Sequence, residues 1–269
     1  MTAISAKDVM ALRAKTGLGM MDCKKALAET SGDMEAAEDL LRKKLKGKME
    51  TRTERAAGEG RIQFSVASDN KKAAIVEIRA ETDFTANNDE FVAASRKIAD
   101  EALTLDAGDH EPTASMTETI DSVRISTGEN ASIARIRVMT SAGSIGSYLH
   151  HDAKTGVLFA YEGDIDAETV SGIAMHITAV VPSPKGVTSD DIPDEVIEKE
   201  RKFALEQAIE SGKNEEIAQK MVEGKVRKLY EELALIEQPF VKDPGTKVKD
   251  LLKGATISGF VRWQLGEDA

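Results

Sequence analysis

Histidine and cysteine are the side chains of this sequence best suited to nucleophilic, acid–base or metal chemistry, and only four histidines and one cysteine are present. His150 and His151 are adjacent, so on a strand they would point to opposite faces, a poor arrangement for holding one metal ion. His176 and Cys23 lie within apolar helical patterns, where packing is favoured over reactivity. We therefore expect a binding protein with no catalytic residue, metal or cofactor, and a hydrolase that uses His150 or His176 is the alternative.

A glycine-rich segment, Gly17-Leu18-Gly19, precedes Lys24 and Lys25 and invites comparison with a phosphate-binding loop. Such a loop needs the pattern GxxxxGK followed by Ser or Thr, and this spacing is not met. The segment is instead typical of a turn between two helices. Direct nucleotide binding is therefore not expected.

The segment from Glu81 to Asn88 places one bulky aromatic residue, Phe84, among polar residues between a predicted strand and a predicted helix. Phe84 could fold back as a hydrophobic plug, or it could project as a rigid anchor for a pocket of a partner. The pair Met20–Met21 raises a similar question, because two adjacent methionines cannot both face one small core. We expect one of them to be exposed and to serve an adaptable interface.

Composition limits the class of protein and of partner. The 269 residues are 41% hydrophobic and 31% charged, which is enough for a core and excludes a wholly disordered chain. A net charge of −11 argues against nucleic-acid or anionic-membrane binding over the whole surface. The single cysteine suits a reducing compartment, the first residues lack the pattern of a signal peptide, and no apolar run approaches the roughly 20 residues of a membrane helix. These features predict a cytoplasmic location.

Three short helices are predicted at the N-terminus. Ser5 and Asp8 have the spacing of a capping box for the first helix, and Asp33 can cap the third. This helical module is expected to end near Lys46. The segment 42–55 then carries seven basic and two acidic residues, which we interpret as a basic linker, with RNA contact as the alternative. Residues 1–56 are thus expected to form a helical domain with its linker.

Period-two patterns dominate the region that follows. We expect strands over 62–66, 73–80, 133–140, 144–150 and 157–161, and helices over 116–125, over 170–177 and after a cap at Asp89. Both halves place strands before a helix. The predicted fold class is therefore α+β, with two related core subdomains over 57–141 and 142–269.

Long, charged helical patterns over 194–210 and 215–235 follow, separated by Ser211-Gly212-Lys213. Two long helices joined by so short a turn predict an antiparallel hairpin, inserted in the second subdomain at about 190–236. A short helix over 248–252 and a strand over 256–265 are expected to return the chain to the sheet. The sequence leaves open whether the hairpin pairs with a second copy, as in a homodimer, or stays free.

Two segments, 12–27 and 77–87, resemble the signatures of the bacterial elongation factor Ts family, whose members exchange guanine nucleotides on elongation factor Tu. The second segment departs from the family pattern at Arg79, where Asn is usual, and at Thr85, where Val is usual. Further matches follow in order over residues 127–130, 146–150, 173–176, 217–224 and 238–241. The resemblance covers nearly the whole chain.

This resemblance implies a ubiquitin-associated (UBA)-like N-terminal domain and a role as an exchange factor that binds elongation factor Tu and promotes release of GDP. It implies that Arg13, Met20 and Met21 touch the G domain of elongation factor Tu. The segment Thr82, Asp83, Phe84 and Thr85 would press near the partner's magnesium site, and Tyr148 and His150 would meet a distal domain.

Overall fold

The computed structural model describes residues 4–16, 18–50, 55–212 and 214–267. Gly17 of the predicted glycine turn, residues 51–54 of the basic segment and Lys213 of the predicted hairpin break lie outside these ranges. The chain divides into two compact units. Unit 1 comprises residues 1–65, 74–138 and 265–269, and unit 2 comprises residues 66–73 and 139–264.

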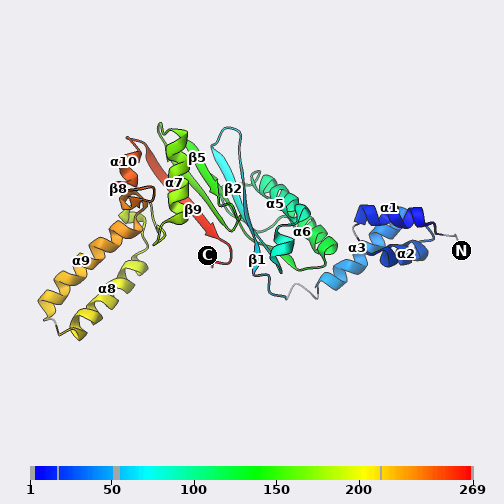
Figure 1. Cartoon of the computed structure of the whole chain (residues 1–269), viewed down its shortest axis with the longest axis horizontal. Coiled ribbons are helices and arrows are strands. Elements are labelled where there is room, and N and C mark those ends of the chain that lie inside the picture. The colour runs from blue at the N-terminus through cyan, green and yellow to red at the C-terminus, as the bar shows by residue number, and fades with distance from the viewer. Residues whose placement is uncertain (1–3, 17, 51–54, 213, 268–269) are drawn as a thin grey trace. The chain divides into compact units, whose positions relative to one another are not determined.

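The N-terminal module of unit 1 contains α1 (Ala6–Thr16), α2 (Met20–Glu29) and α3 (Met34–Glu50) (Figure 1). The predicted N-cap at Ser5 is confirmed, because the Asp8 N–H donates to Ser5 Oγ (3.1 Å), and Ser5 Oγ in turn donates to Asp8 Oδ2 (2.6 Å). Asp33 caps α3 as predicted. The apolar side chains that the three helices share are Val9, Leu12, Cys23, Ala26, Leu27, Ala37 and Leu41.

The predicted end of this module near Lys46 is wrong, because α3 continues to Glu50. Lys and Arg are good helix formers, so a basic sequence can continue a helix that has already begun. The first part of the basic segment is therefore helical and not a linker.

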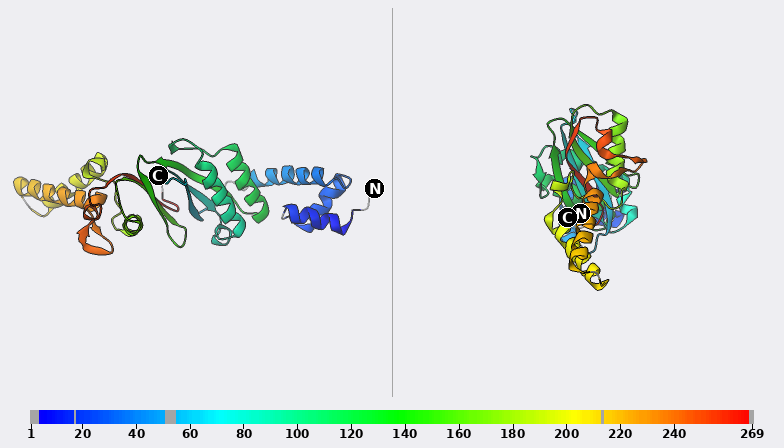
Figure 2. Two further views of the ribbon diagram at one scale, coloured as in Figure 1. Left: turned by 90° about the horizontal axis from the view of Figure 1, so that it is seen from above. Right: turned by 90° about the vertical axis from the view of Figure 1, so that its left-hand side faces the viewer.

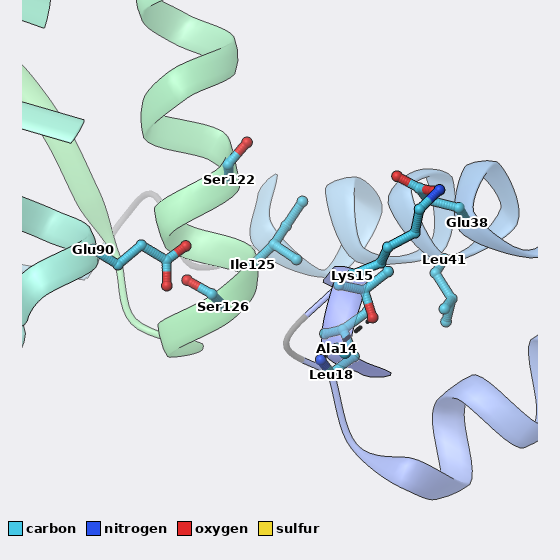
Figure 3. Close-up of a pocket in the computed structure, with 10 residues that line it drawn as sticks. Ala14, Lys15, Leu18, Glu38, Leu41, Glu90, Ser122, Ile125 and Ser126 are labelled. Atoms are coloured by element: carbon cyan, nitrogen blue, oxygen red, sulfur yellow. Dashed lines mark hydrogen bonds and ion pairs between the residues drawn. The ribbon is translucent and has the colours of Figure 1, made fainter. Parts of the chain in front are cut away.

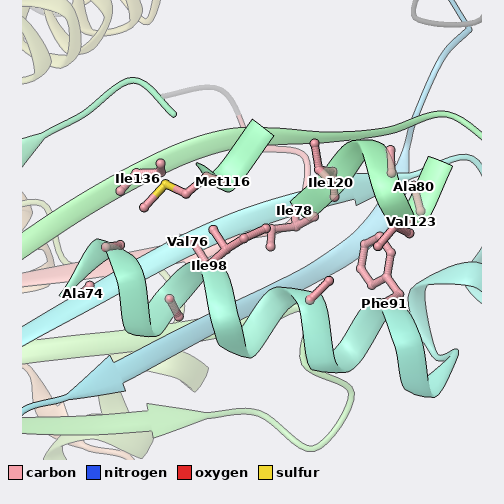
Figure 4. Close-up of a cluster of buried hydrophobic side chains, with 14 of the residues drawn as sticks. Ala74, Val76, Ile78, Ala80, Phe91, Ile98, Met116, Ile120, Val123 and Ile136 are labelled. Carbon is pink, nitrogen blue, oxygen red and sulfur yellow. The ribbon is translucent and has the colours of Figure 1, made fainter. Parts of the chain in front are cut away.

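The sheet of unit 1 has the strand order β1-β2-β4-β3. The strands are β1 (Glu59–Val66), β2 (Lys72–Ala80), β3 (Gly108–Asp109) and β4 (Ala131–Thr140), and β3 pairs antiparallel with β4. The helices that cover one face are α5 (Asp89–Ala102) and α6 (Ala114–Thr127) (Figures 1 and 4). Figure 4 shows alternate residues of β2, such as Val76 and Ile78, packed against Phe91 and Ile98 of α5 and Met116 of α6.

Helix α5 begins as expected, but its cap differs from the prediction. Asn88, and not Asp89, is the N-cap, and its Oδ1 accepts the Glu90 N–H at 2.8 Å. Asn and Asp are equally good caps, so the sequence pattern could not separate two adjacent candidates.

The sheet of unit 2 has the order β5-β6-β9, formed by β5 (Ser144–Leu149), β6 (Thr155–Glu162) and β9 (Thr256–Gln264), all antiparallel. Helix α7 (Ala167–Ala179) shares a buried cluster with this sheet, in which Phe159 of β6 contacts the group around Ile173 and Ile177. A side chain at Gly146 of β5 would collide with the Phe159 ring, so glycine is required at this position. The mixed α+β class is confirmed.

Unit 2 also contains two long helices, α8 (Asp194–Glu210) and α9 (Glu215–Leu233), whose predicted starts are confirmed. They lie side by side in Figures 1 and 2 and share buried residues such as Ala204, Val222 and Val226. The remaining elements of unit 2 are the short helices η1 (Ser189–Asp191), η2 (Leu235–Glu237) and α10 (Val248–Leu251), and the strands β7 (Pro239–Phe240) and β8 (Asp243–Lys247).

Within the described ranges, no helix combines the length and the apolar character needed to cross a membrane. The domain boundaries at 56, 141 and 190–236, together with the UBA-like character of the N-terminal module, stay predictions.

Candidate functional site

The segment predicted as a loop around Phe84 is a single helical turn, α4 (Asp83–Ala86). Thr82 is its N-cap, with an extended backbone and a hydroxyl that accepts the Thr85 N–H at 3.3 Å. Asp83 Oδ1 accepts the Phe84 N–H at 2.9 Å, and Asn87 Nδ2 donates to the Asp83 carbonyl at 2.9 Å. These short-range bonds satisfy backbone groups that a four-residue helix cannot pair internally.

Phe84 is 85% exposed, so it does not fold back as a plug. Asp83 beside it is also exposed. Thr85 is only 6% exposed and Ala86 is buried, which fixes the other side of the turn to the core of unit 1. The turn therefore presents an aromatic ring and a carboxylate to solvent on a backbone that its own caps hold in place.

Residues far away in the sequence support the same turn. Thr82 Oγ1 donates to the Glu129 carboxylate, 2.9 Å and 3.0 Å from its two oxygens. The Asn130 N–H donates to Glu81 Oε1 at 2.7 Å, and Asn130 Nδ2 donates to the Arg55 carbonyl at 2.8 Å. Both residues before the turn are thus held by the segment 129–130, which we call the Glu129–Asn130 brace.

The C-terminal end of the turn meets a half-buried cation. Arg61 Nη1 of β1 lies 3.5 Å from the Ala86 carbonyl, a favourable place for positive charge at the end of a helical turn. Burial and the neighbouring Arg96 lower the pKa of Arg61. The sequence patterns did not single out Arg61, because its partner is a backbone carbonyl 25 residues away.

The N-terminal module exposes the residues that the family resemblance implies. Met20 is 48% exposed and Met21 is 63% exposed, and Arg13 is exposed on α1. The expected exposure of one methionine is confirmed, and the other is exposed as well, because Cys23 and Leu27 fill the buried side of α2. Met10 on α1 is exposed as well and was not predicted.

Tyr148 and His150 lie in unit 2 and are both half-buried. Strand β5 ends at Leu149, so His150 and His151 occupy a turn and do not point to opposite faces of a strand. Their ring centroids are 4.4 Å apart in an edge arrangement, and Tyr148 Oη lies 3.4 Å from His150 Nδ1. The expected position of the two histidines on a strand is therefore wrong, because the strand ends one residue before His150.

His176 has the satisfied partner that its helical context predicts. It is buried, Nε2 lies 3.0 Å from Gln238 Oε1, and Nδ1 accepts the Val241 N–H at 3.1 Å. Burial lowers its pKa, while the hydrogen bond to Gln238 opposes that shift. Within residues 4–16, 18–50, 55–212 and 214–267, no three His, Cys, Asp or Glu side chains are grouped so that they could hold a metal ion.

A cavity of about 280 Å³ lies in unit 1 (Figure 3). Lys15 and Glu38 form a 3.2 Å ion pair at its wall. The residues that line it are Ala14, Lys15, Thr16, Leu18, Glu38, Leu41, Glu90, Ser122, Ile125 and Ser126. None of the residues of α4 is among them, so the exposed turn lies outside this cavity.

Comparison with known proteins agrees with the order of motifs along the chain. The family model described as Elongation factor TS matches residues 81–267. Elongation factor Ts of Hydrogenovibrio crunogenus is 46% identical over 277 residues, covering 98% of this chain and 92% of the relative. Elongation factor Ts of Hahella chejuensis is 41% identical, covering 99% of this chain and 93% of the relative. The chain therefore belongs to the elongation factor Ts family of translation elongation factors.

Proposed function

We propose that this protein is a guanine-nucleotide exchange factor that binds GDP-bound elongation factor Tu and promotes the release of GDP, so that GTP can bind. The observation that carries the proposal is the exposed Phe84 ring on a turn held at both ends. Solvent exposure of a large aromatic side chain is unfavourable unless a partner covers it, and buried aromatic anchors dominate the energetics of interfaces.

Exchange requires no bond to be made or broken in the factor. A factor that binds the nucleotide-free partner more tightly than the nucleotide-bound one weakens nucleotide binding by the same ratio, because the two equilibria are linked. In this proposal Phe84 enters between helices of the partner. The adjacent Asp83 carboxylate and the turn then disturb the partner's Mg²⁺ ion, which is the main positive charge that holds the phosphates.

The other exposed side chains would widen the interface. Met20 and Met21 suit contact with the G domain because unbranched, polarisable side chains adapt to a partner surface. Arg13 would add a charged contact, and Tyr148 and His150 would reach a distal domain of elongation factor Tu. The roles of Arg13, Met20 and Met21 follow from the family resemblance together with the exposure of these residues, whereas those of Tyr148 and His150 follow from the resemblance alone.

Release of a fluorescent GDP analogue from elongation factor Tu tests the proposal. Burial of a Phe ring contributes roughly 1.5–3 kcal/mol, and about 1.4 kcal/mol corresponds to one decade. Phe84→Ala should therefore slow release by about one to two decades. Phe203→Ala on α8, which truncates another exposed ring, is the matched control and should leave the rate within about twofold. A Phe84→Ala rate within twofold of the wild type would rule out the proposed role of the ring.

We also propose that two copies of the chain associate through α8 and α9. Four large apolar side chains of these helices are exposed: Phe203, Ile209, Ile217 and Met221. The exchange proposal does not use them, and a second copy would remove them from water.

A further inference from the structure

The contact between Thr82 and Glu129 joins residues that are 47 positions apart in the sequence. Glu129 follows Gly128, the C-cap of α6, whose φ of 74° is a left-handed conformation that glycine adopts without strain. The Gly128 N–H donates to the Arg124 carbonyl at 2.9 Å, and the Glu129 N–H lies 3.3 Å from Thr127 Oγ1. The end of α6 therefore fixes the position of the Glu129 carboxylate next to Thr82.

The chemistry of the contact restricts the Thr82 side chain to one orientation. An ionised carboxylate only accepts hydrogen bonds, so the Thr82 hydroxyl must donate to it. The same hydroxyl oxygen accepts the Thr85 N–H, which caps α4. Hydrogen bonds to a charged acceptor are stronger than neutral ones, and bonds in a chain polarise one another. Glu129 thus fixes the rotamer from which Thr82 caps the turn that carries Phe84.

The neighbouring residue acts on the chain just before the cap. Asn130 is buried, and its N–H donates to Glu81 Oε1 at 2.7 Å. Glu81 Oε2 is also 3.6 Å from Arg55 Nη1. The Glu129–Asn130 brace therefore determines where the backbone enters α4, and the four-residue helix has too few internal bonds to determine this by itself.

We propose that Glu129 is a positioning residue for nucleotide exchange, which acts through Thr82 to hold Phe84 in the orientation that the partner binds. This inference rests on the proposed exchange function. Glu129 need not touch the partner. Because it orders the turn before binding, the entropic cost of ordering Phe84 on binding is avoided. Ordering one free side chain costs enough to change affinity by a factor of about three to ten.

The test measures GDP release from elongation factor Tu at several concentrations of the full-length factor. Glu129→Ala should raise the concentration of factor needed for half-maximal exchange by about three- to tenfold. Glu129→Gln keeps an acceptor oxygen, so the concentration of factor that it needs for half-maximal exchange should stay close to that of the wild type. Glu118→Ala, on the exposed surface of α6, is the matched control and should behave as the wild type. Urea denaturation of all three variants checks that each is folded under the conditions of the exchange assay.

A double-mutant cycle with Phe84→Ala separates this inference from the proposed function. If Glu129 acts through Phe84, Glu129→Ala should have no further effect when Phe84 is already alanine. An equal loss in both backgrounds would overturn the positioning role, as would full activity of Glu129→Ala beside an impaired Phe84→Ala. A Phe84→Ala variant with normal exchange would instead contradict the proposed function itself. Thr82→Val, which removes the donor, gives a second route to the same cycle if Glu129→Ala does not fold.

Discussion

The turn α4 and the paired helices α8 and α9 both expose large apolar side chains, but they are held in place in different ways. In α4, Phe84 lies two residues from Thr82, whose hydroxyl is bonded to Glu129. In α8 and α9, the exposed side chains lie along the two helices, away from the network that holds the end of α9. A short segment thus needs support from distant residues, whereas long helices support themselves by packing on each other.

The base of α8 and α9 shows this difference most clearly. Gln238 Nε2 donates to the carbonyls of Pro182 (3.1 Å) and Glu232 (2.7 Å), and its Oε1 faces buried His176. This network fixes the chain where α9 ends. Towards the other end of the helices, Ala204, Ala208 and Val222 are buried, and Lys225 Nζ donates to Gln207 Oε1 at 2.9 Å. The comparison indicates that the network at the base contributes stability, and that the brace at α4 contributes orientation.

The largest expected effect concerns stability at this base. His176→Leu removes the partners of Gln238 Oε1 and of the Val241 N–H. Each buried group left unpaired costs about 1–3 kcal/mol, so the free energy of unfolding should fall by about 2–5 kcal/mol. Urea denaturation followed by circular dichroism measures this. A change below about 1 kcal/mol would show that the network contributes little and would remove the contrast with α4.

The second effect is a pH dependence with its origin at the same histidine. Because the Val241 N–H donates to Nδ1, folded His176 is neutral with its proton on Nε2, and burial lowers its pKa below the ordinary value of 6.5. Below pH 6.5 the unfolded chain binds a proton that the folded chain does not, so stability is complete above this pH and is lost as the pH falls towards the folded pKa. The slope should reach at most about 1.4 kcal/mol per pH unit.

The control for this pH effect is His176→Gln, which lacks the titrating group and should lose the slope just below pH 6.5. The pKa of the Asp166, Asp191 and Glu237 carboxyls is also lowered, through hydrogen bonds to Thr169, Thr188 and Lys247 respectively. These carboxyls titrate at lower pH, so they do not contribute to the slope just below pH 6.5 that is assigned to His176. The same slope in both proteins would assign the effect to other groups.

A third and smaller effect distinguishes the stabilising role of the Thr82 cap from the binding role of the Phe84 ring in α4. Thr82→Ala removes the N-cap and the donor to Glu129, and loss of such a cap costs about 0.5–2 kcal/mol. Phe84→Ala removes mostly exposed atoms and should change the free energy of unfolding by less than about 0.5 kcal/mol. Both should slow GDP release. If Phe84→Ala also destabilised the fold by more than Thr82→Ala, the ring would have a structural role in addition to partner binding.

The smallest effect is the association of two chains through α8 and α9. Light scattering over a range of concentrations should show an average mass that rises above the 29.0 kDa of one chain. The double variant Phe203→Ser with Met221→Ser should stay at the monomer mass, because it makes the exposed surface polar. Phe84→Ala is the control and should associate as the wild type does. A mass that stays at that of the monomer for the wild type would contradict association through α8 and α9.

Local patterns were sufficient for much of the fold. The Ser5–Asp8 cap, the start of α8 at Asp194 and the start of α9 at Glu215 were predicted correctly, because caps and helical periodicity depend on residues three or four apart. The β1–β2 region was also predicted, from alternation in the first strand and an apolar run in the second. The family motifs pointed to Phe84 as well, although from the sequence a plug and an exposed anchor were both possible.

Only the tertiary structure decided how the side chains of the site are placed. Both Met20 and Met21 are exposed because Cys23 and Leu27 already fill the small core, and Phe84 projects because Thr85 and Ala86 occupy the buried side of the turn. The contact of Glu129 with Thr82 spans 47 residues. The amino-acid sequence by itself determined the helices, strands and motifs, since these depend on neighbours along the chain. The exposure of Phe84 and its brace depend on which distant segments meet, and this is settled only when the cores have formed.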